Sequence, residues 1–276
     1  MVIMRINAYY YQQFDADHSQ DVPAESYLGW QKGEIEIDLD HTALVIMHAW
    51  DCGTEDMYPG WYRHVEYIPR ANAILKNVFP RLLEGVRASR LQVVHVVAGG
   101  RYYKDLPGYK KTLKLAGKAQ DHYQSIKKDP ARKKLDQFRT IHAGQGLHNI
   151  DDIKRGFKAL DFPREAIPKE NEFIVDSSAQ LFKLCNKMRI SHLIYIGFAI
   201  NWCLLLSPGG MVDMSRHGIM CSTIRQAVIA VENAETARNE LCKEIALWRV
   251  AFSFGFIFDL EALLSALKKN TLDKKN

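Results

Sequence analysis

The sequence contains no apolar run that approaches the roughly 20 residues of a membrane-spanning helix. Its N-terminal stretch, MVIMRINAYYYQQFD, also lacks the apolar segment of a secretory signal, so we predict neither a membrane segment nor export. The five cysteines are an odd number and include no CxxC pair. This pattern favours reduced thiols in a cytoplasmic protein over a disulfide framework.

Signals for a cofactor or a metal are lacking as well. The sequence holds neither a GxGxxG motif nor a phosphate-binding P-loop, so we predict no nucleotide cofactor. His95 stands alone within an apolar run, where we expect it in the core, and four other histidines show no spacing typical of ligands. These are His64, His142, His148 and His217. We therefore predict no metal site.

The composition is that of a globular protein with one core. Apolar residues make up 47% of the 276 residues and charged residues 25%, which argues against disorder. The formal charge of +5 could favour an anionic ligand or a nucleic acid. The basic residues are concentrated in one stretch, however, and the aromatic residues among them form no RNA-binding signature. We interpret that stretch as a solvated face and do not predict nucleic-acid binding.

Short apolar runs alternate with helical patterns along most of the chain. We expect buried strands at 43–47, 91–97, 172–176, 193–197, 218–223 and 254–258. Strands that alternate with helices are typical of a parallel sheet covered on both faces. The order predicts an α/β fold, namely a three-layer α/β/α doubly wound sandwich whose mainly parallel sheet has about six strands. Within the helical pattern at 71–86, Pro80 should kink or restart the helix.

Three segments fall outside this repeat. Residues 1–40 combine tyrosines with acidic residues, and we interpret them as an N-terminal arm with a hairpin that could take part in subunit contact. Residues 41–270 form the single predicted domain, with a basic insertion or lid at about 101–169. Residues 271–276 form a polar tail.

Chemistry in an open parallel sheet is expected beyond the carboxyl ends of its strands. There the strand at 193–197 runs into Gly197-Phe198-Ala199-Ile200-Asn201-Trp202-Cys203, and three leucines then begin a helix. A cysteine in the first turn of a helix is exposed to the positive end of the peptide dipoles, which favours the thiolate. Backbone N–H groups of the same turn could hold an oxyanion.

This segment resembles the nucleophile turn of the isochorismatase-like cysteine hydrolases, G-x-A-T-N-x-C, with Ile200 in place of the threonine. The order of the surrounding pieces, TALVIM, PRLLEGVRASRLQVVHV and FGFIFDLEALLSAL, is similar to that family over most of residues 42–267. The resemblance implies a Rossmann-like isochorismatase fold and Cys203 as nucleophile. It also implies a cis peptide near Ala199 and Ile200, and an oxyanion turn that includes Trp202.

Two positions depart from the family pattern. Where the family has an aspartate after the first parallel strand, this sequence has His48, and where it has a lysine, this sequence has Asp176. One interpretation is a degenerate member in which Cys203 is a small buried apolar residue. The other is an exchanged triad in which His48 takes the proton of the Cys203 thiol and Asp176 orients the imidazole. A slip of one residue in the strand would put Met47 at the site instead.

Three further residues are weaker candidates for substrate binding. Trp50 could form an aromatic wall together with Tyr58 and Trp61. Asp51 could serve as an acid, although turn formation in DCGTED explains it equally well. Lys104 could replace the missing lysine.

The leading hypothesis is a cofactor-independent hydrolase that cleaves a C–N amide or related bond of a small molecule through a Cys203 thioester. The alternative is a catalytically silent family member that acts as a binding or scaffold protein. By resemblance we expect a homo-oligomer, either a dimer or a tetramer.

Overall fold

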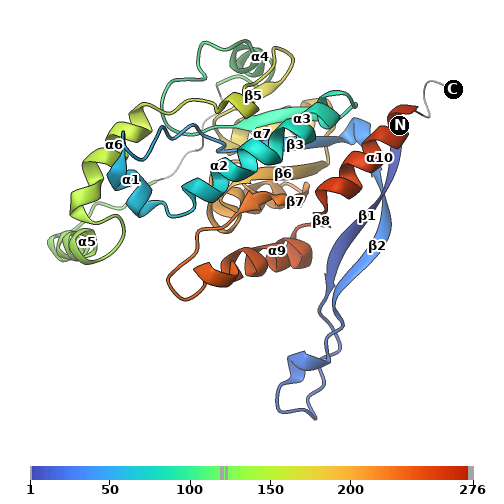
Figure 1. The fold of residues 1–276 in the computed structure, drawn as a ribbon, viewed down its shortest axis with the longest axis horizontal. Coiled ribbons are helices and arrows are strands. Elements are labelled where there is room, and N and C mark those ends of the chain that lie inside the picture. The colour runs from blue at the N-terminus through green and yellow to red at the C-terminus, as the bar shows by residue number, and fades with distance from the viewer. Residues whose placement is uncertain (1, 119–120, 122–123, 273–276) are drawn as a thin grey trace.

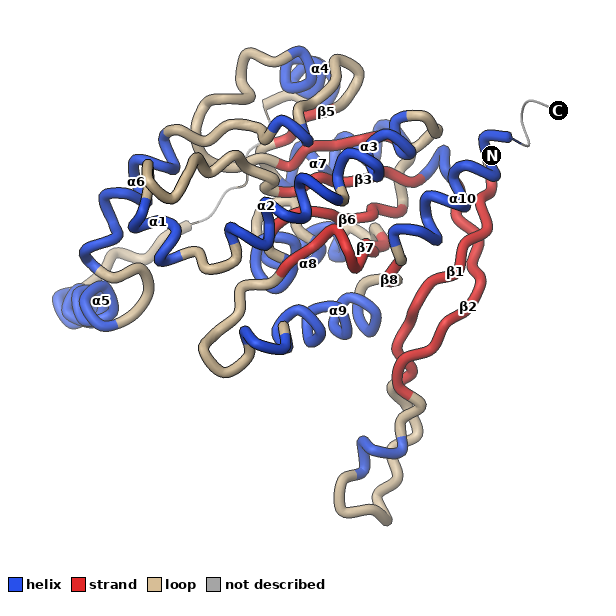
Figure 2. Tube along the Cα trace, viewed as in Figure 1, coloured by secondary structure: helices blue, strands red, loops and turns tan. Residues whose placement is uncertain are grey.

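The computed structural model describes residues 2–118, residue 121 and residues 124–272 (Figure 1). Its strands are β1 (Ile3–Gln12), β2 (Gly29–Asp38), β3 (Thr42–Met47), β4 (Gln92–Val96), β5 (Phe173–Val175), β6 (His192–Phe198), β7 (Met220–Ile229) and β8 (Ile257–Phe258). They form one sheet in the order β2-β1-β8-β7-β6-β3-β4-β5 (Figure 2). The six strands from β8 to β5 are parallel, whereas β1 and β2 are antiparallel to their neighbours.

Helices cover both faces of this sheet. They are α1 (Pro59–His64), α2 (Ile68–Asn77), α3 (Phe79–Arg87), α4 (Pro107–Ala116), α5 (Pro130–His142), α6 (Ile150–Lys158), α7 (Ser178–Met188), α8 (Met211–Arg216), α9 (Leu241–Ser253) and α10 (Leu260–Leu272). Side chains of α2, α3 and α10 share one core cluster with the sheet, and side chains of α7, α8 and α9 share another. The predicted three-layer α/β/α fold is therefore confirmed.

Strand β3 shows why the runs of apolar residues are continuous in the central strands. Leu44 and Ile46 belong to the core on the α2 side, whereas Ala43, Val45 and Met47 belong to the core on the α7 side. Successive side chains of a strand point to opposite faces, so a sheet covered on both faces needs apolar residues at every position.

The sheet has two strands more than the six that we predicted. The additional strands, β1 and β2, form an antiparallel hairpin within the predicted arm, and β1 pairs with β8 at Tyr9 and Ile257. Met4, Ile6 and Ala8 of β1 are buried and alternate with exposed residues. One face of the hairpin thus extends the core, while its far end projects from the body of the protein (Figure 1).

Pro80 separates two helices, as predicted. Helix α2 ends at Asn77 and α3 begins at Phe79, so that Pro80 occupies the first turn of α3. A proline is tolerated there because the N–H groups of the first turn have no partner within the helix.

The stretch predicted as a basic insertion contains α4, α5 and α6 and contributes no strand to the sheet in its described part. Helix α4 contacts β5 and α7, and α6 contacts α1. Residues 273–276 of the predicted polar tail lie outside the described residues. A search of the described helices found none that is both long and apolar enough to cross a membrane.

A buried ionic network joins the end of this stretch to the sheet. His95 of β4 is buried, as predicted, and its Nε2 lies 2.8 Å from the carboxylate of Glu172. Arg87 of α3 donates to the same carboxylate from Nε at 2.7 Å and Nη2 at 3.1 Å. Burial opposes ionisation, but the hydrogen bonds from His95 and Arg87 prevail and lower the pKa of Glu172 to about 2.

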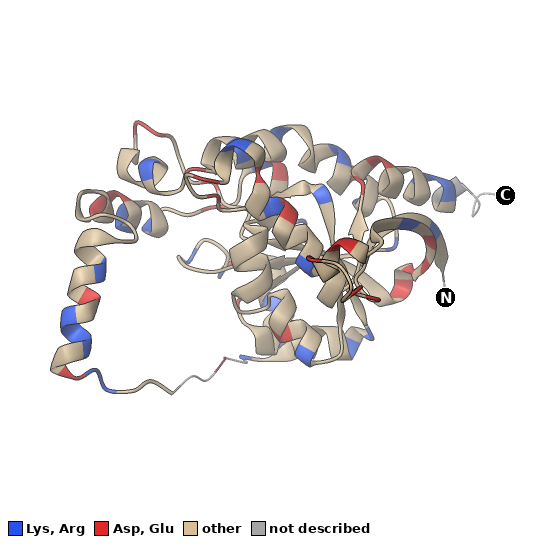
Figure 3. Cartoon of the chain, turned by 90° about the horizontal axis from the view of Figure 1, so that it is seen from below, with Lys and Arg blue, Asp and Glu red and all other residues tan. Residues whose placement is uncertain are grey.

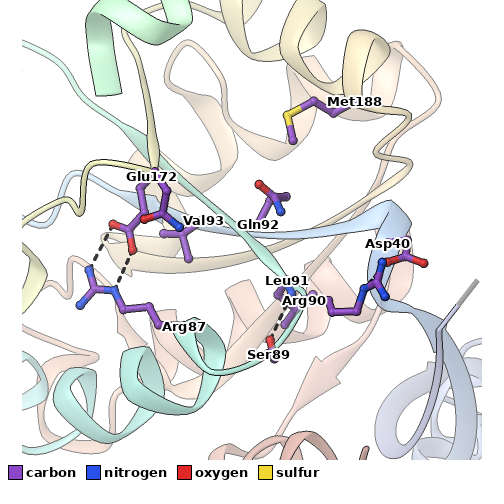
Figure 4. Close-up of a pocket in the computed structure, with 10 residues that line it drawn as sticks. Asp40, Arg87, Ser89, Arg90, Leu91, Gln92, Val93, Glu172 and Met188 are labelled. Atoms are coloured by element: carbon purple, nitrogen blue, oxygen red, sulfur yellow. Dashed lines mark hydrogen bonds and ion pairs between the residues drawn. The ribbon is translucent and has the colours of Figure 1, made fainter. Parts of the chain in front are cut away.

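Glu172 also lines a cavity of about 300 Å³ near the starts of β4 and β5 (Figure 4). Arg90 at its other side is paired with Asp40 at 2.7 Å. The arginines that line this cavity are thus neutralised by carboxylates, and we interpret the cavity as part of the scaffold.

We predict that Glu172→Gln lowers the free energy of unfolding at neutral pH by about 3 kcal/mol, because Arg87 loses its buried counter-charge. The depressed pKa of Glu172 means that its contribution is present above pH 4.5 and is lost as the pH falls toward 2. Urea denaturation at pH 7 measures the loss. The exposed neighbour Glu170→Gln serves as the control and should change stability by less than about 0.5 kcal/mol. Equal stability of the two variants would contradict the role assigned to the network.

Candidate active site

A cavity of about 220 Å³ lies beyond the carboxyl ends of β3 and β6. Its walls come from the two strand ends, from α1 and α2, and from the stretch between residues 145 and 157. The lining residues are His48, Trp50, Cys52, Trp61, His64, Val65, Tyr67, Ile68, Ala71, Asn72, Gln145, Ile153, Phe157, Phe198 and Cys203. The predicted nucleophile and the predicted base therefore line the same cavity.

Cys203 reaches the cavity from a wide helical turn. The peptide bond between Phe198 and Ala199 is cis, at the position that the family resemblance implied. A π-helical turn follows over Ile200–Leu204, closed by a hydrogen bond from the Leu204 N–H to the Ala199 carbonyl. The three leucines had suggested a helix that begins after Cys203. The helical turn instead begins before Cys203. Cys203 itself is half-buried.

The side chain of Asn201 anchors this turn to the next strand. Its amide nitrogen donates to the carbonyl of Val231 at 2.8 Å, and its oxygen accepts from the N–H of Val231 at 2.9 Å. This two-point contact fixes the turn against the residues that follow β7. The asparagine of the motif therefore has a positioning role in this chain.

The other residues of the predicted oxyanion turn differ in burial and in backbone hydrogen bonding. The N–H of Trp202 donates to the carbonyl of Ala199 at 3.2 Å, which removes it as a donor to a ligand. The side chain of Trp202 is exposed and does not line the cavity. Ala199 and Ile200 are buried, and Ile200 packs in the core on the α7 side.

His48 occupies the position that the alignment predicted, and the alternative register with Met47 at the site is wrong. Strand β3 ends at Met47, which lies in the core, and His48 follows with a positive φ of 51°. The backbone N–H of His48 donates a hydrogen bond to the backbone carbonyl of Val96 at 3.1 Å. Its imidazole is 5% exposed and stacks on Trp50, with 4.7 Å between the ring centroids.

The imidazole of His48 is a neutral base at physiological pH. Its Nδ1 is buried and has no hydrogen-bond partner among the described residues. Burial lowers the pKa of His48 to about 4, since no nearby charge compensates the loss of hydration. Stacking on Trp50, and not a carboxylate, holds the ring in place.

Asp176 is not brought to His48, so the predicted triad is not assembled. Asp176 follows β5, and β4 lies between β5 and β3. Asp176 is not among the described residues that line the cavity of His48 and Cys203. The carboxylate of Asp176 instead accepts hydrogen bonds from the hydroxyl of Tyr103 at 3.1 Å and from that of Tyr109 at 2.8 Å.

Of the three weaker candidates, only Trp50 lines the cavity, and its indole N–H donates to the hydroxyl of Tyr102 at 3.0 Å. Asp51 is exposed, and its carboxylate accepts from the N–H of Gly53 at 2.8 Å, which is the turn-forming role. Lys104 is exposed and lies 6.0 Å from the ring of Tyr103, outside the cavity. Lys104 therefore does not take the place of the lysine that the resemblance led us to expect.

The sequence did not single out most of the cavity's walls. The sequence indicates Trp61 as part of an aromatic wall. It does not indicate Tyr67, Asn72, Gln145 or Phe157, because the segments of these four residues show only helical or loop patterns. Trp61 stacks on Phe157 of α6, with 5.0 Å between the ring centroids.

The contact between α1 and α6 depends on a glycine. A Cβ atom at Gly156 would come within 1.7 Å of the Trp61 ring, so only glycine allows α6 to lie against α1. This close approach fixes one aromatic wall of the cavity.

Among the residues that the structure describes, no lysine, arginine, aspartate or glutamate lines the cavity. Burial, with a further contribution from Asp51, raises the pKa of the Cys52 thiol to about 12. Burial also raises the pKa of Tyr67 well above its usual range, and the thiolate forms of Cys203 and Cys52 would raise it further. The walls around Cys203 are therefore aromatic and neutral. No group of three or more potential ligands for a metal ion occurs among the described residues.

No protein-family model matches the chain, and no curated protein matches its sequence. Among solved structures, a cysteine hydrolase from Pseudomonas syringae pv. phaseolicola is 14% identical, with a TM-score of 0.48 over 85% of this chain and 95% of that one. An isochorismatase-like hydrolase from Alkaliphilus metalliredigens is 14% identical, with a TM-score of 0.45 over 82% and 98%. A nicotinamidase from Acinetobacter baumanii is 12% identical, with a TM-score of 0.40 over 81% and 98%. Similarity of this degree carries no argument about activity or substrate.

We predict that His48 makes the protein less stable as the pH falls. An unfolded histidine binds a proton near pH 6.5, but His48 in the folded protein does so only near pH 4. Between these values the unfolded state binds more protons, so the free energy of unfolding should fall by up to about 3 kcal/mol on acidification.

His48→Gln should remove this component and make the profile of unfolding free energy less steep between pH 7 and pH 4, measured by urea denaturation, while His192, whose pKa burial also lowers to about 4, keeps part of the slope. The exposed His18→Gln provides the matched control and should keep the wild-type slope. A slope in His48→Gln as steep as that of the wild type would refute the buried neutral state of His48.

Proposed function

We propose that the protein is a cysteine hydrolase of the isochorismatase-like kind, which acts on a small uncharged molecule with Cys203 as nucleophile and His48 as base. The observation that carries this proposal is that Cys203 and His48, from the adjacent strands β6 and β3, line one small cavity in which no described lining residue is a lysine, arginine, aspartate or glutamate. The motif around Cys203 supports the same activity by resemblance.

The chemistry needs only these two groups and water. The Cys203 thiol transfers its proton to the neutral imidazole of His48 as the sulfur attacks the carbonyl carbon of the substrate. The C–N bond then breaks, the proton passes to the departing nitrogen, and a thioester remains on Cys203. Water hydrolyses the thioester and returns the thiol. Trp50 orients the imidazole by stacking, which replaces the acid that the exchanged triad required.

The walls of the cavity favour a flat and uncharged substrate. Aromatic rings supply a large apolar surface for a neutral substrate. An ion that enters without a counter-charge loses its hydration, and apolar walls do not compensate this loss. Asn72 and Gln145 are the amides in the lining, and they can give hydrogen bonds to a carboxamide. We therefore propose neutral carboxamides with an aromatic or compact apolar group as the substrate class.

All five cysteines are free, which suits a thiol-dependent enzyme in the reducing cytoplasm. We therefore include a cytoplasmic localisation in the proposal.

One observation favours the alternative of a catalytically silent binding protein. A base whose pKa lies near 4 is weak for removing a proton from a thiol, and no carboxylate or lysine of the cavity assists it. In that case the cavity would bind the same class of neutral molecule without turning it over.

The first test measures the thiol itself. We expect iodoacetamide to alkylate Cys203 at neutral pH at least about tenfold faster than Cys242, and His48→Gln to reduce that rate toward the rate of Cys242. Cys242 is the matched control because it is half-buried like Cys203 but lies outside the cavity. Mass spectrometry of quenched samples resolves the two sites. Equal rates for both cysteines in the wild type would favour the silent alternative.

The second test measures turnover. A panel of neutral aromatic and aliphatic carboxamides should release ammonia with the wild type, and Cys203→Ala should reduce the rate by about a thousandfold or more. Cys242→Ala should retain the wild-type rate. Binding of a panel member to both the wild type and Cys203→Ala, without release of ammonia by either, would identify a silent binding protein and contradict the hydrolase.

A further inference from the structure

Two elements project from the body of the protein and expose apolar side chains. One is the hairpin tip, residues 13–28, between β1 and β2. The other is the basic segment, residues 124–142, which contains α5. Figures 1 and 3 show them at different ends of the molecule, so they do not meet within one chain.

Helix α5 has no buried residue along its 13 positions. Leu135 and Phe138 are each 63% exposed, and Ile141 is 47% exposed. These residues are three apart and therefore share one face of the helix. In Figure 3 the helix stands apart from the sheet and its covering helices. A helix of this length is marginal in water without a packed face, so α5 needs a partner surface.

The remaining faces of the basic segment carry its charge. It holds six basic and two acidic residues, a formal charge of +4. Both acidic residues are engaged locally, because Asp129 caps α5 and Asp136 pairs with Lys128 and Arg132. Other cations make no ion pair with any residue that the structure describes. They are Lys127, Lys133, Lys134 and Arg139.

The hairpin tip has the complementary character. It holds four acidic residues and no lysine or arginine, a formal charge of −4. Asp17 is engaged in local hydrogen bonds to Ser19 and Gln20, but Asp21 and Glu25 make no ion pair with a described residue. Exposed apolar side chains accompany these charges. They are Phe14, Val22 and Leu28, exposed at 55%, 51% and 66%.

We propose that the hairpin tip of one copy of this chain docks on the basic segment of a second copy, with the apolar residues of both elements at the centre and the opposite charges around them. We select a second copy of this chain as the partner because the two protruding elements carry equal and opposite formal charges. Oppositely charged patches steer association and fix register, while the apolar residues supply the buried area.

The contact would bear on the candidate active site. Gln145 follows the basic segment by three residues and lines the cavity of Cys203. A partner that holds α5 thereby also holds the adjoining cavity wall.

The test uses sedimentation velocity of the full chain over a range of concentrations. We expect self-association that weakens as ionic strength rises from about 0.05 M to about 1 M, because salt screens exposed charges. Asp21→Lys/Glu25→Lys on the tip should raise the dissociation constant by about tenfold or more. Lys133→Glu/Lys134→Glu on α5 should do the same.

The decisive variant carries both pairs of reversals in one chain. Each pair brings the formal charge of its element to zero, and the combined variant should associate at least about threefold more tightly than a variant with either pair alone, because the reversed residues of the two elements again have opposite charges. Lys183→Glu/Lys187→Glu, on the exposed side of α7, is the matched control and should associate like the wild type. Thermal unfolding checks that every variant is folded.

Three outcomes would overturn the proposal. They are a wild type that is monomeric at every concentration, an oligomer that neither pair of reversals weakens, and a failure of the combined variant to recover. A wild type that stays monomeric but sediments with vesicles rich in phosphatidylserine would assign the basic segment to an anionic membrane surface instead.

Discussion

Neighbouring strands of a parallel sheet lie about 4.8 Å apart, and this spacing decides which of the strand-end residues can meet. Strand β3 pairs with β6, so His48 and Cys203 reach the same cavity. Strand β5 is separated from β3 by β4, and Asp176 is not among the described residues that line this cavity. The hydroxyls of two tyrosines hold the carboxylate of Asp176 in place instead.

In the proposed mechanism only Cys203 and His48 act, and their environment sets the properties of both. Burial keeps His48 neutral, and the aromatic stack with Trp50 keeps its ring in one orientation. The side-chain amide of Asn201 makes two hydrogen bonds to the backbone of Val231, and these fix the turn that carries the Cys203 thiol. The geometry of the pair thus follows from packing and hydrogen bonds, without an ion pair.

The sequence predicted the layers of the fold and all six parallel strands because continuous apolar runs and helical periods are local signals. It also predicted the place of His48, since the family pattern counts residues along one strand. The hairpin pairing with β8 joins residues about 250 positions apart, so no local pattern could have revealed it. The same limit applies to Asp176, whose distance from His48 depends on the order of the strands, and to the cavity walls contributed by α2 and α6.

Neutral walls have a consequence for the end of the proposed reaction. Hydrolysis of a carboxamide converts an uncharged molecule into an acid that is ionised at neutral pH. No lysine or arginine is found among the described residues that line the cavity, so the product anion has no counter-charge there. An unpaired carboxylate among aromatic rings is unfavourable. The cavity therefore binds the neutral amide more tightly than the ionised acid. The acid leaves readily, and product inhibition of the proposed reaction is weak.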